Sequence, residues 1–245
     1  MRAFLARLKA GTEHLNYGRD TVASMAARRV VRPPDGPVRI VDLGLGTAAD
    51  LLNVARALEP AACELAGVEC HPPYAASARE RGIDVHALNL ERDALPWDDG
   101  SVDLVVANQV LEHCKEIFWI AAEVVRVLKP GGLFIVGVPN LASLHSRVML
   151  ALGMQPSPID VLGPHVRGFT PGGLARFLGE GGFLEVVERR GGNYYPFPPS
   201  VARPLARLLP GSAVSLFLAC ERTPRRGSFL SALDARSLET PFYRG

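Results

Sequence analysis

Short apolar runs alternate along this chain with longer segments in which apolar residues recur at helical spacing. Alternation at this pitch indicates βαβ units and a parallel sheet. The apolar runs predict strands at 38–43, 65–69, 84–88, 102–107, 133–138, 183–188 and 213–220. The periodic segments predict helices at 48–58, 72–81, 115–128 and 170–180, and one or two more before residue 32.

The regular alternation of predicted strands and helices stops after residue 139. Residues 140–168 form a long connection with one helical piece and three later prolines, and residues 191–211 form a second, proline-rich insertion. Connections of this length are usually functional or mobile. We therefore expect an N-terminal helical segment at 1–37, a main domain at 38–221 that contains both insertions, and a partly disordered, arginine-rich tail at 222–245.

Composition narrows the class of protein. The 245 residues carry a net charge of only +2, which gives no reason to expect a nucleic-acid partner. No segment approaches the ~18 apolar residues of a membrane helix, and Met1–Glu13 lacks the apolar region of a signal peptide. We expect a soluble, cytoplasmic protein without an integral membrane segment. Its cysteines form no C-x-x-C pair and fit reduced, buried thiols: Cys63, Cys70, Cys114 and Cys220.

Residues Val38–Thr47, Val-Arg-Ile-Val-Asp-Leu-Gly-Leu-Gly-Thr, carry the strongest functional signal. An apolar strand ends in Asp42, a tight turn follows at Gly44-Leu45-Gly46, and an unbroken helical run comes next. Glycine tolerates positive φ and lets a ligand approach the backbone. The helix start adds unpaired N–H groups and a positive dipole end. Because such turns bind nucleotide-like ligands, we expect an adenosine-containing cofactor.

This turn alone does not identify the cofactor. Gly44-x-Gly46-x-x-Ala49, with Glu69 about 20 residues on, also fits the dinucleotide fingerprint of dehydrogenases. Against that interpretation, a long segment precedes the strand and no second domain remains to hold a hydride acceptor. An insertion also separates the last two predicted strands, so the end of the sheet need not be parallel.

Three downstream motifs change the picture: Leu95-Pro-Trp-Asp-Asp-Gly-Ser-Val-Asp-Leu-Val105, Asn108-Gln-Val-Leu-Glu-His113 and Val127-Leu-Lys-Pro-Gly-Gly132. With the glycine turn, they closely resemble the class I S-adenosylmethionine-dependent methyltransferases, in their broad small-molecule branch of type 11. The resemblance covers about residues 38–190 and a final strand. It implies an α/β, doubly wound, Rossmann-like sheet of seven mostly parallel strands with an antiparallel last strand. It also implies S-adenosyl-L-methionine as the cofactor.

The resemblance further implies roles for single residues. Asp42 and the glycine turn would border the methionine part, Glu69 would bind both ribose hydroxyls, and Asn108 would lie near the sulfonium. The implied cofactor-binding residues are Asp42, Gly44, Leu45, Gly46, Glu69, Cys70, Asn89, Leu90 and Asn108. Two features depart from the family pattern. Ala48 replaces its third glycine, and Asn89-Leu90, where an aspartate often binds adenine, falls two residues beyond the commonest spacing.

Methyl transfer to a hydroxyl needs orientation and a base. His113 lies in the Leu-Glu-His motif, and His165 lies in a His-x-Arg-x-Phe-Thr-Pro stretch that resembles part of an acceptor pocket. Both are candidate catalytic residues; a structural hydrogen bond is the alternative role for His113. Arg167 is a candidate anion contact or a surface charge, and His145 is a third candidate base, with a surface or packing role as the alternative. No H-E-x-x-H spacing is present, so we expect no metal.

The sequence thus predicts a methyltransferase that acts on a small molecule or a saccharide, at a hydroxyl. Transfer to an amine or a carbon is the second possibility, and a non-catalytic cofactor-binding partner is the competing class. The acceptor pocket is expected in the two insertions, where Tyr194, Tyr195 and Phe197 stack on a ring or merely pack. The N-terminal helices, with Asn16–Arg19, either cover the cofactor as a lid or pack on the sheet.

Overall fold

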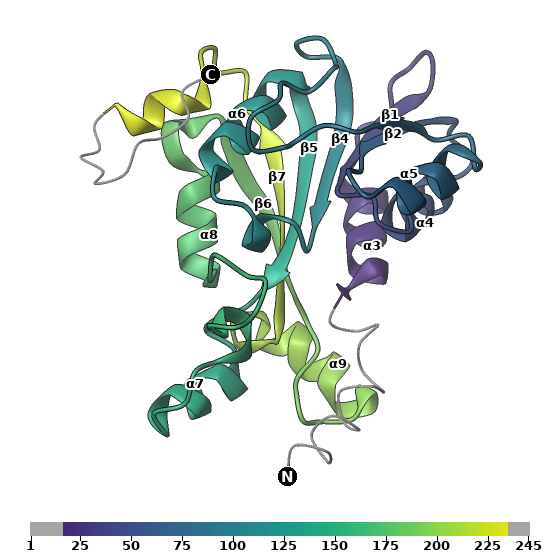
Figure 1. Cartoon of the computed structure of the whole chain (residues 1–245). Helices are drawn as coiled ribbons and strands as arrows, with labels where there is room; N and C mark the ends of the chain where they lie inside the picture. Colours follow the sequence, from purple (N-terminus) through teal and green to yellow (C-terminus); the bar gives the residue numbers. More distant parts are fainter. Residues whose placement is uncertain (1–16, 235–245) are drawn as a thin grey trace.

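A seven-stranded sheet with helices on both faces organises the chain (Figure 1). The computed structural model describes residues 17–234. The strand order is β3-β2-β1-β4-β5-β7-β6, and β7 runs antiparallel to both of its neighbours. This arrangement confirms the predicted fold class. The strands are β1 Val38–Leu43, β2 Cys63–Val68, β3 Asp84–His86, β4 Val102–Asn108, β5 Leu128–Pro139, β6 Leu184–Gly192 and β7 Ser215–Arg222.

Helices α5, α7, α8 and α9 begin where the sequence supplies a capping side chain or a proline. Thr170 accepts a hydrogen bond from the Gly173 N–H and caps α8, and Ser143 caps α7 through the Ser146 N–H. Helices α5, α8 and α9 carry proline in the first turn. The helices are α3 Arg19–Arg29, α4 Ala49–Leu58, α5 Pro72–Arg79, α6 Ile117–Val127, α7 Leu144–Ala151, α8 Pro171–Leu178 and α9 Pro199–Leu208.

Strand β4 is buried along its whole length because helices cover both faces of the sheet. Its side chains alternate: Val105 and Ala107 belong to the core on the α6 and α8 face. Leu104 and Val106 belong to the core under α3, α4 and α5. Every helix within residues 17–234 is too short or too polar to traverse a lipid bilayer.

Two elements differ from their predicted extents. Strand β5 begins at Leu128 rather than at 133, because Leu128 pairs with Val102 before a register shift, and Lys129 Nζ lies 2.6 Å from Asp103 Oδ1. The Lys-Pro-Gly-Gly stretch is thus an irregular part of the strand.

The second insertion contains α9, an amphipathic helix where an irregular segment was expected. Its prolines suit the first turn, although Pro204 lies inside the helix.

The beginning of the expected tail is folded onto the domain. After β7, a short 3-10 helix, η5 (Phe229–Leu233), packs against α6. The Phe229 ring is fully buried, with the rings of Phe118, Phe177 and Phe183 around it. One short turn has no periodicity by which the sequence could reveal it. The remainder, 235–245, lies outside the described residues, as do the helices expected before residue 17.

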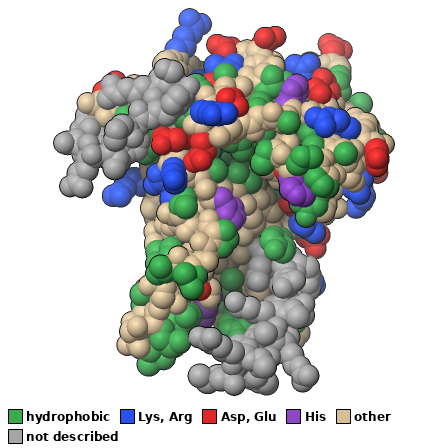
Figure 2. Space-filling model, in the orientation of Figure 1, with side chains coloured by type: hydrophobic (Ala, Val, Ile, Leu, Met, Phe, Trp, Pro, Cys, Tyr) green, Lys and Arg blue, Asp and Glu red, His purple; other side chains and the backbone are tan. Residues whose placement is uncertain are grey.

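The two insertions lie together beyond the carboxyl ends of the parallel strands, where α7 and α9 form a lobe (Figure 1). Buried Asn140 joins them: its Nδ2 donates to the carbonyls of Gly211 and Ala213, and its Oδ1 accepts from the Ala142 N–H. Apolar side chains are exposed over the α7 part of the lobe (Figure 2). They include Leu144, Val148, Leu150, Leu152 and Met154.

Candidate active site

The glycine turn joins β1 to α4 at the carboxyl edge of the sheet. Gly44 and Gly46 adopt φ of 77° and 49°, a region that glycine enters without strain. A Cβ on Gly44 would lie 2.9 Å from Val110 Cγ2, so the turn contacts the loop after β4. Ala48, in the place of the third glycine, also takes positive φ, 58°, with its methyl buried. The substitution therefore keeps the backbone path of the turn.

Glu69 bridges the end of β2 to this turn. One carboxylate oxygen accepts from the Gly46 N–H and the other from the His71 N–H, both at 2.7 Å. The side chain is 8% exposed, and its position is fixed by these two backbone donors. Each carboxylate oxygen can accept a further hydrogen bond. The geometry therefore fits two ribose hydroxyls, and this role remains a prediction.

Several buried polar atoms beside the turn have no hydrogen-bond partner within residues 17–234. They include Asp50 Oδ1, Arg19 Nε and Asn108 Oδ1, while Asn108 Nδ2 donates to the Tyr17 carbonyl at 2.7 Å. Arg19 Nε lies 4.0 Å from Asp50 Oδ1. Burial raises the pKa of the Asp42 carboxyl well above its usual range, and the nearby Asp50 and Glu69 carboxylates raise it further. Acidic groups with raised pKa and the Arg19 guanidinium, which makes only a long ion pair with Asp50, match the amino-acid end of the expected cofactor, with its ammonium and carboxylate.

Arg19 and Asp50 were missed by the sequence analysis. Asp50 stands in the first turn of the helix after the glycine turn, and that position was the available signal. Arg19 comes from α3, a distant segment that only the fold brings to the turn. At the start of the described residues, the backbone of Tyr17 and Gly18 lies against Asn108 and the Phe217 ring.

The candidate adenine contacts form a compact turn after β3. Asn89 Oδ1 accepts from the Glu91 N–H at 2.9 Å, and the Asn89 N–H donates to Asp93 Oδ2 at 2.7 Å. The Asn89 carbonyl oxygen is thus already engaged within its own turn, whereas Leu90 is half-buried. Cys70 is exposed next to Glu69. The adenine-side roles of Asn89, Leu90 and Cys70 remain predictions.

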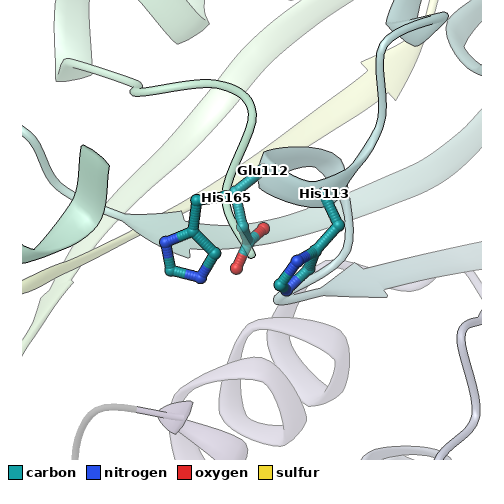
Figure 3. A group of neighbouring side chains, drawn as sticks. All are labelled: Glu112, His113 and His165. Atoms are coloured by element: carbon teal, nitrogen blue, oxygen red, sulfur yellow. The ribbon is translucent and has the colours of Figure 1, made fainter. Parts of the chain in front are cut away.

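His113 and His165 come together although they are far apart in sequence (Figure 3). Their ring centroids are 4.8 Å apart. His113 ends η1, a 3-10 helix (Leu111–His113) after β4, and His165 lies in the first insertion. The backbone joins the two segments, because the N–H groups of Val166 and Arg167 donate to the Glu112 carbonyl at 2.8 and 3.1 Å. Burial lowers the pKa of His113, against a raising effect of its bond to the Pro164 carbonyl.

Glu112 lies between these histidines and was missed as a candidate, since its motif drew attention to His113. The residue is 1% exposed, and in the part of the chain that the structure describes neither carboxylate oxygen has a hydrogen-bond partner. Burial raises the pKa of Glu112 to about 8. A buried, unpaired carboxyl group is costly unless a proton or a cation accompanies it.

The remaining candidates have structural contacts. The Arg167 guanidinium donates to the carbonyls of Cys114 and Lys115, so it braces the His165 segment on η1 instead of presenting a free anion contact. His145 packs against Tyr195, with ring centroids 5.8 Å apart. Tyr194 is buried and its hydroxyl donates to the Leu209 carbonyl, which is a packing role.

Comparisons with known proteins agree with this geometry. Residues 41–136 match a family model described as a methyltransferase domain. A demethylmenaquinone methyltransferase of Thermus thermophilus is 36% identical over 104 residues, 41% of this chain and 46% of that protein. A ubiquinone biosynthesis O-methyltransferase of Mesorhizobium japonicum is 26% identical over 218 residues, 77% of each protein. A crystal structure of an S-adenosylmethionine-dependent methyltransferase from Mesorhizobium loti has a TM-score of 0.55 at 20% identity, covering 83% of this chain and 100% of that chain.

The sheet order and the glycine turn define an α/β protein that binds a nucleotide-like cofactor at the carboxyl edge of its sheet. Residues 41–136 thus match a methyltransferase domain, and a probable S-adenosylmethionine-dependent methyltransferase of Mycolicibacterium smegmatis is 33% identical over 143 residues, so S-adenosylmethionine is the cofactor that these relatives imply. The comparisons thereby favour this cofactor over the dinucleotide interpretation of the same turn. The chain spans only 31% to 49% of the length of three of its curated relatives.

Proposed function

We propose that this protein transfers the methyl group of S-adenosylmethionine to a hydroxyl oxygen of a small molecule or a saccharide. The observation that carries the proposal is the pair of imidazoles, His113 and His165, 4.8 Å apart and next to the glycine turn. Gly44 contacts Val110, which precedes η1, so the cofactor turn and the histidines share one end of the sheet.

The cofactor supplies an electrophilic methyl group on a sulfonium. In our proposal Glu69 would accept the ribose hydroxyls, while Asp42, Asp50 and Arg19 would pair with the amino-acid end. Asn108 is buried at the end of β4. In the sequence it follows the residues proposed for the cofactor and precedes the two histidines. Holding both reactants in this way supplies orientation, which can provide a large part of the rate enhancement.

The histidines then serve the acceptor. His113 Nδ1 lies 3.3 Å from the Pro164 carbonyl, and His165 Nδ1 lies 3.0 Å from the Pro158 carbonyl. A carbonyl accepts from Nδ1–H, so each ring keeps the Nε2 lone pair free for a proton from the acceptor hydroxyl. The lowered pKa of His113 keeps its ring neutral and able to accept that proton near pH 7. Such a base contributes roughly 10²–10⁴-fold to a rate.

The lobe of the two insertions would contribute the acceptor pocket. Its exposed apolar side chains favour an acceptor with an apolar part over a bare saccharide. Nitrogen or carbon acceptors remain the second candidates. We place the reaction in the cytoplasm, since all four cysteines are free thiols, and we expect no nucleic-acid acceptor at a net charge of +2.

Calorimetric titration with S-adenosylmethionine, then an acceptor screen that measures S-adenosylhomocysteine, tests the proposal. We expect micromolar binding that Glu69→Gln weakens by about tenfold or more, through loss of charge-assisted hydrogen bonds. Glu185→Gln, an exposed carboxylate on β6, is the matched control and should leave binding unchanged. Turnover with hydroxylated compounds and none with matched amines would support O-methylation. Binding without turnover across hydroxyl, amine and carbon acceptors would favour the non-catalytic class.

A further inference from the structure

Glu112, His113 and His165 form a compact group of metal-ligating side chains. Each offers one ligand atom, and these atoms all lie within 4.8 Å of one another (Figure 3). We propose that this group binds a divalent transition-metal ion through the Glu112 carboxylate and one ring nitrogen of each histidine. The site goes beyond the proposed methyl transfer, and the binding of the ion can be tested without an acceptor.

Glu112 gives the first independent support. A side chain that is 1% exposed holds two carboxylate oxygens, and neither has a hydrogen-bond donor among the described residues. Buried charged groups in proteins are normally paired or coordinate a metal. The positive group of Arg167, on the neighbouring His165 segment, is engaged elsewhere, because it donates to the carbonyls of Cys114 and Lys115. A bound cation would satisfy both oxygens.

The hydrogen bonds of the two histidines give the second support. Each Nδ1 atom faces a backbone carbonyl, that of Pro164 for His113 and that of Pro158 for His165. In metal sites, ligating histidines almost always donate their other ring N–H to a carbonyl or a carboxylate, which fixes the tautomer and the ring orientation. Here this arrangement leaves the Nε2 atom of each ring as the available ligand.

The spacing requires only a small adjustment. Zinc-like ions bind nitrogen and oxygen ligands at about 2.0–2.2 Å, which places ligand atoms roughly 3–3.5 Å from one another in tetrahedral or octahedral sites. The present atoms would move together by about 1 Å or less each, within the reach of side-chain rotation. His113 is exposed and His165 is half-buried, so both rings have room to turn.

Two histidines and one carboxylate define the chemistry of the ion. This ligand set suits Zn²⁺, Co²⁺, Fe²⁺ or Mn²⁺ and leaves coordination positions open. If the proposed function holds, an open position would receive the acceptor oxygen. The ion would lower the pKa of that hydroxyl, and its proton would pass to water. The histidines would then act as ligands rather than as the direct base.

This site departs from the expectation of no metal drawn from the sequence. That expectation rested on the absence of ligand pairs at local spacing. His165 lies in an insertion whose path is not readable from periodicity, and the backbone bonds from Val166 and Arg167 to the Glu112 carbonyl bring it to η1. The third ligand, His165, therefore reaches the other two only in the folded chain.

The test uses the full chain, first treated with EDTA, and then titrated with Zn²⁺ by calorimetry and with Co²⁺ by visible absorption. We expect one ion per chain. Affinity should fall by about 100-fold or more in His113→Ala, His165→Ala and Glu112→Gln, since loss of even an outer-shell partner costs 10–100-fold. His86→Ala, a histidine on β3 with its own partner Asp84, is the matched control and should bind as the parent does.

The outcomes separate the two proposals. S-adenosylmethionine binding, measured on every variant, shows that each one is folded. Failure of the parent chain to bind either ion stoichiometrically, or equal binding by His113→Ala, would overturn the metal site and leave the histidines as a direct base. Specific metal binding without turnover of any acceptor would uphold the site and reject the proposed function.

Discussion

Asp42, Asp50 and Glu69 gather three carboxylates around one glycine turn, and two of them carry a raised pKa. Burial is the first cause for both Asp42 and Asp50. The mutual repulsion of these groups adds to the shift at Asp42, whereas Asn108 and Arg19 oppose it at Asp50. Perturbed titration of this kind gathers at functional sites, where a ligand provides the missing compensation. We infer that cofactor binding relieves an unfavourable arrangement that the free protein sustains.

Asp42→Asn should stabilise the cofactor-free protein while weakening its binding of S-adenosylmethionine. The folded-state pKa of Asp42 is raised above the usual 3.8, so the folded state holds this proton more tightly than the unfolded chain does. The contribution of Asp42 to the free energy of unfolding is therefore greatest below about pH 4 and decreases as the pH rises toward the folded-state value. Asparagine has no such proton, so the stability gained by substitution should grow as the pH rises from about 4 toward neutral.

Urea unfolding of the parent chain and the variant across that pH range measures the difference. Asp98→Asn, an exposed carboxylate in the loop before β4, serves as the control and should show no such trend. A stability difference that stays constant with pH, or that shrinks as the pH rises, would contradict the assignment.

Single residues were predictable where local pattern determined their place. Asp42, Glu69 and Asn108 each stand at or just after the carboxyl end of a parallel strand, and such ends meet at one edge of the sheet. Arg19 and Glu112 carried no comparable signal. Glu112 matters because it is buried without a hydrogen-bond partner among the described residues, and Arg19 because it approaches Asp50; both features arise only when distant segments pack together.

At the scale of elements, hydrogen bonds hold the loop at 164–167 on η1. The Val166 and Arg167 N–H groups donate to the Glu112 carbonyl, and the Arg167 side chain donates to the carbonyls of Cys114 and Lys115. A fork-shaped guanidinium can serve two carbonyls at once, which a lysine ammonium on a flexible stem does poorly. Arg167 therefore positions His165 beside His113 without needing to touch the acceptor.

Arg167→Lys should impair methyl transfer and leave the cofactor affinity unchanged. Loss of one hydrogen bond from a charged donor costs about 1.5–3 kcal/mol, or roughly 10–100-fold in kcat/KM for the acceptor. Calorimetry with S-adenosylmethionine, beside steady-state turnover, separates the two effects. Arg176→Lys, an exposed arginine on α8, is the matched control. Equal losses in cofactor affinity and turnover would show that Arg167 supports the whole domain instead.

Strong periodicity made most elements predictable, and their ends less so. Strand β1 and the start of β4 follow their apolar runs closely, since burial on both faces demands such runs. The start of β5 depends on pairing with Val102 across a bulge, and α9 stands in a stretch whose prolines concealed its helical face. Tertiary pairing and proline placement override local signals at these two points.

For the whole molecule, the sheet edge carries the residues that we propose for cofactor binding, and we propose the acceptor pocket in the lobe beyond it. The lobe comes from two insertions that are separated along the chain by α8 and β6. Buried Asn140 joins them. Its side-chain nitrogen donates to the carbonyls of Gly211 and Ala213, and its side-chain oxygen accepts from the Ala142 N–H. One side chain thus links the acceptor lobe to the end of β5, which belongs to the sheet.

Asn140→Asp should reduce acceptor turnover, which we assign to the lobe, and leave cofactor affinity, which we assign to the sheet edge, unchanged. The carboxylate cannot donate to the Gly211 and Ala213 carbonyls, and it would leave charge in a fully buried position. We expect acceptor turnover to fall by about 100-fold through loss of orientation, with cofactor affinity within twofold of the parent chain. Asn53→Asp on α4, where the side chain is half-buried, provides the control. Because the residues proposed for the cofactor lie outside the lobe, a parallel loss of cofactor affinity would mean that the lobe and the sheet edge form one inseparable site.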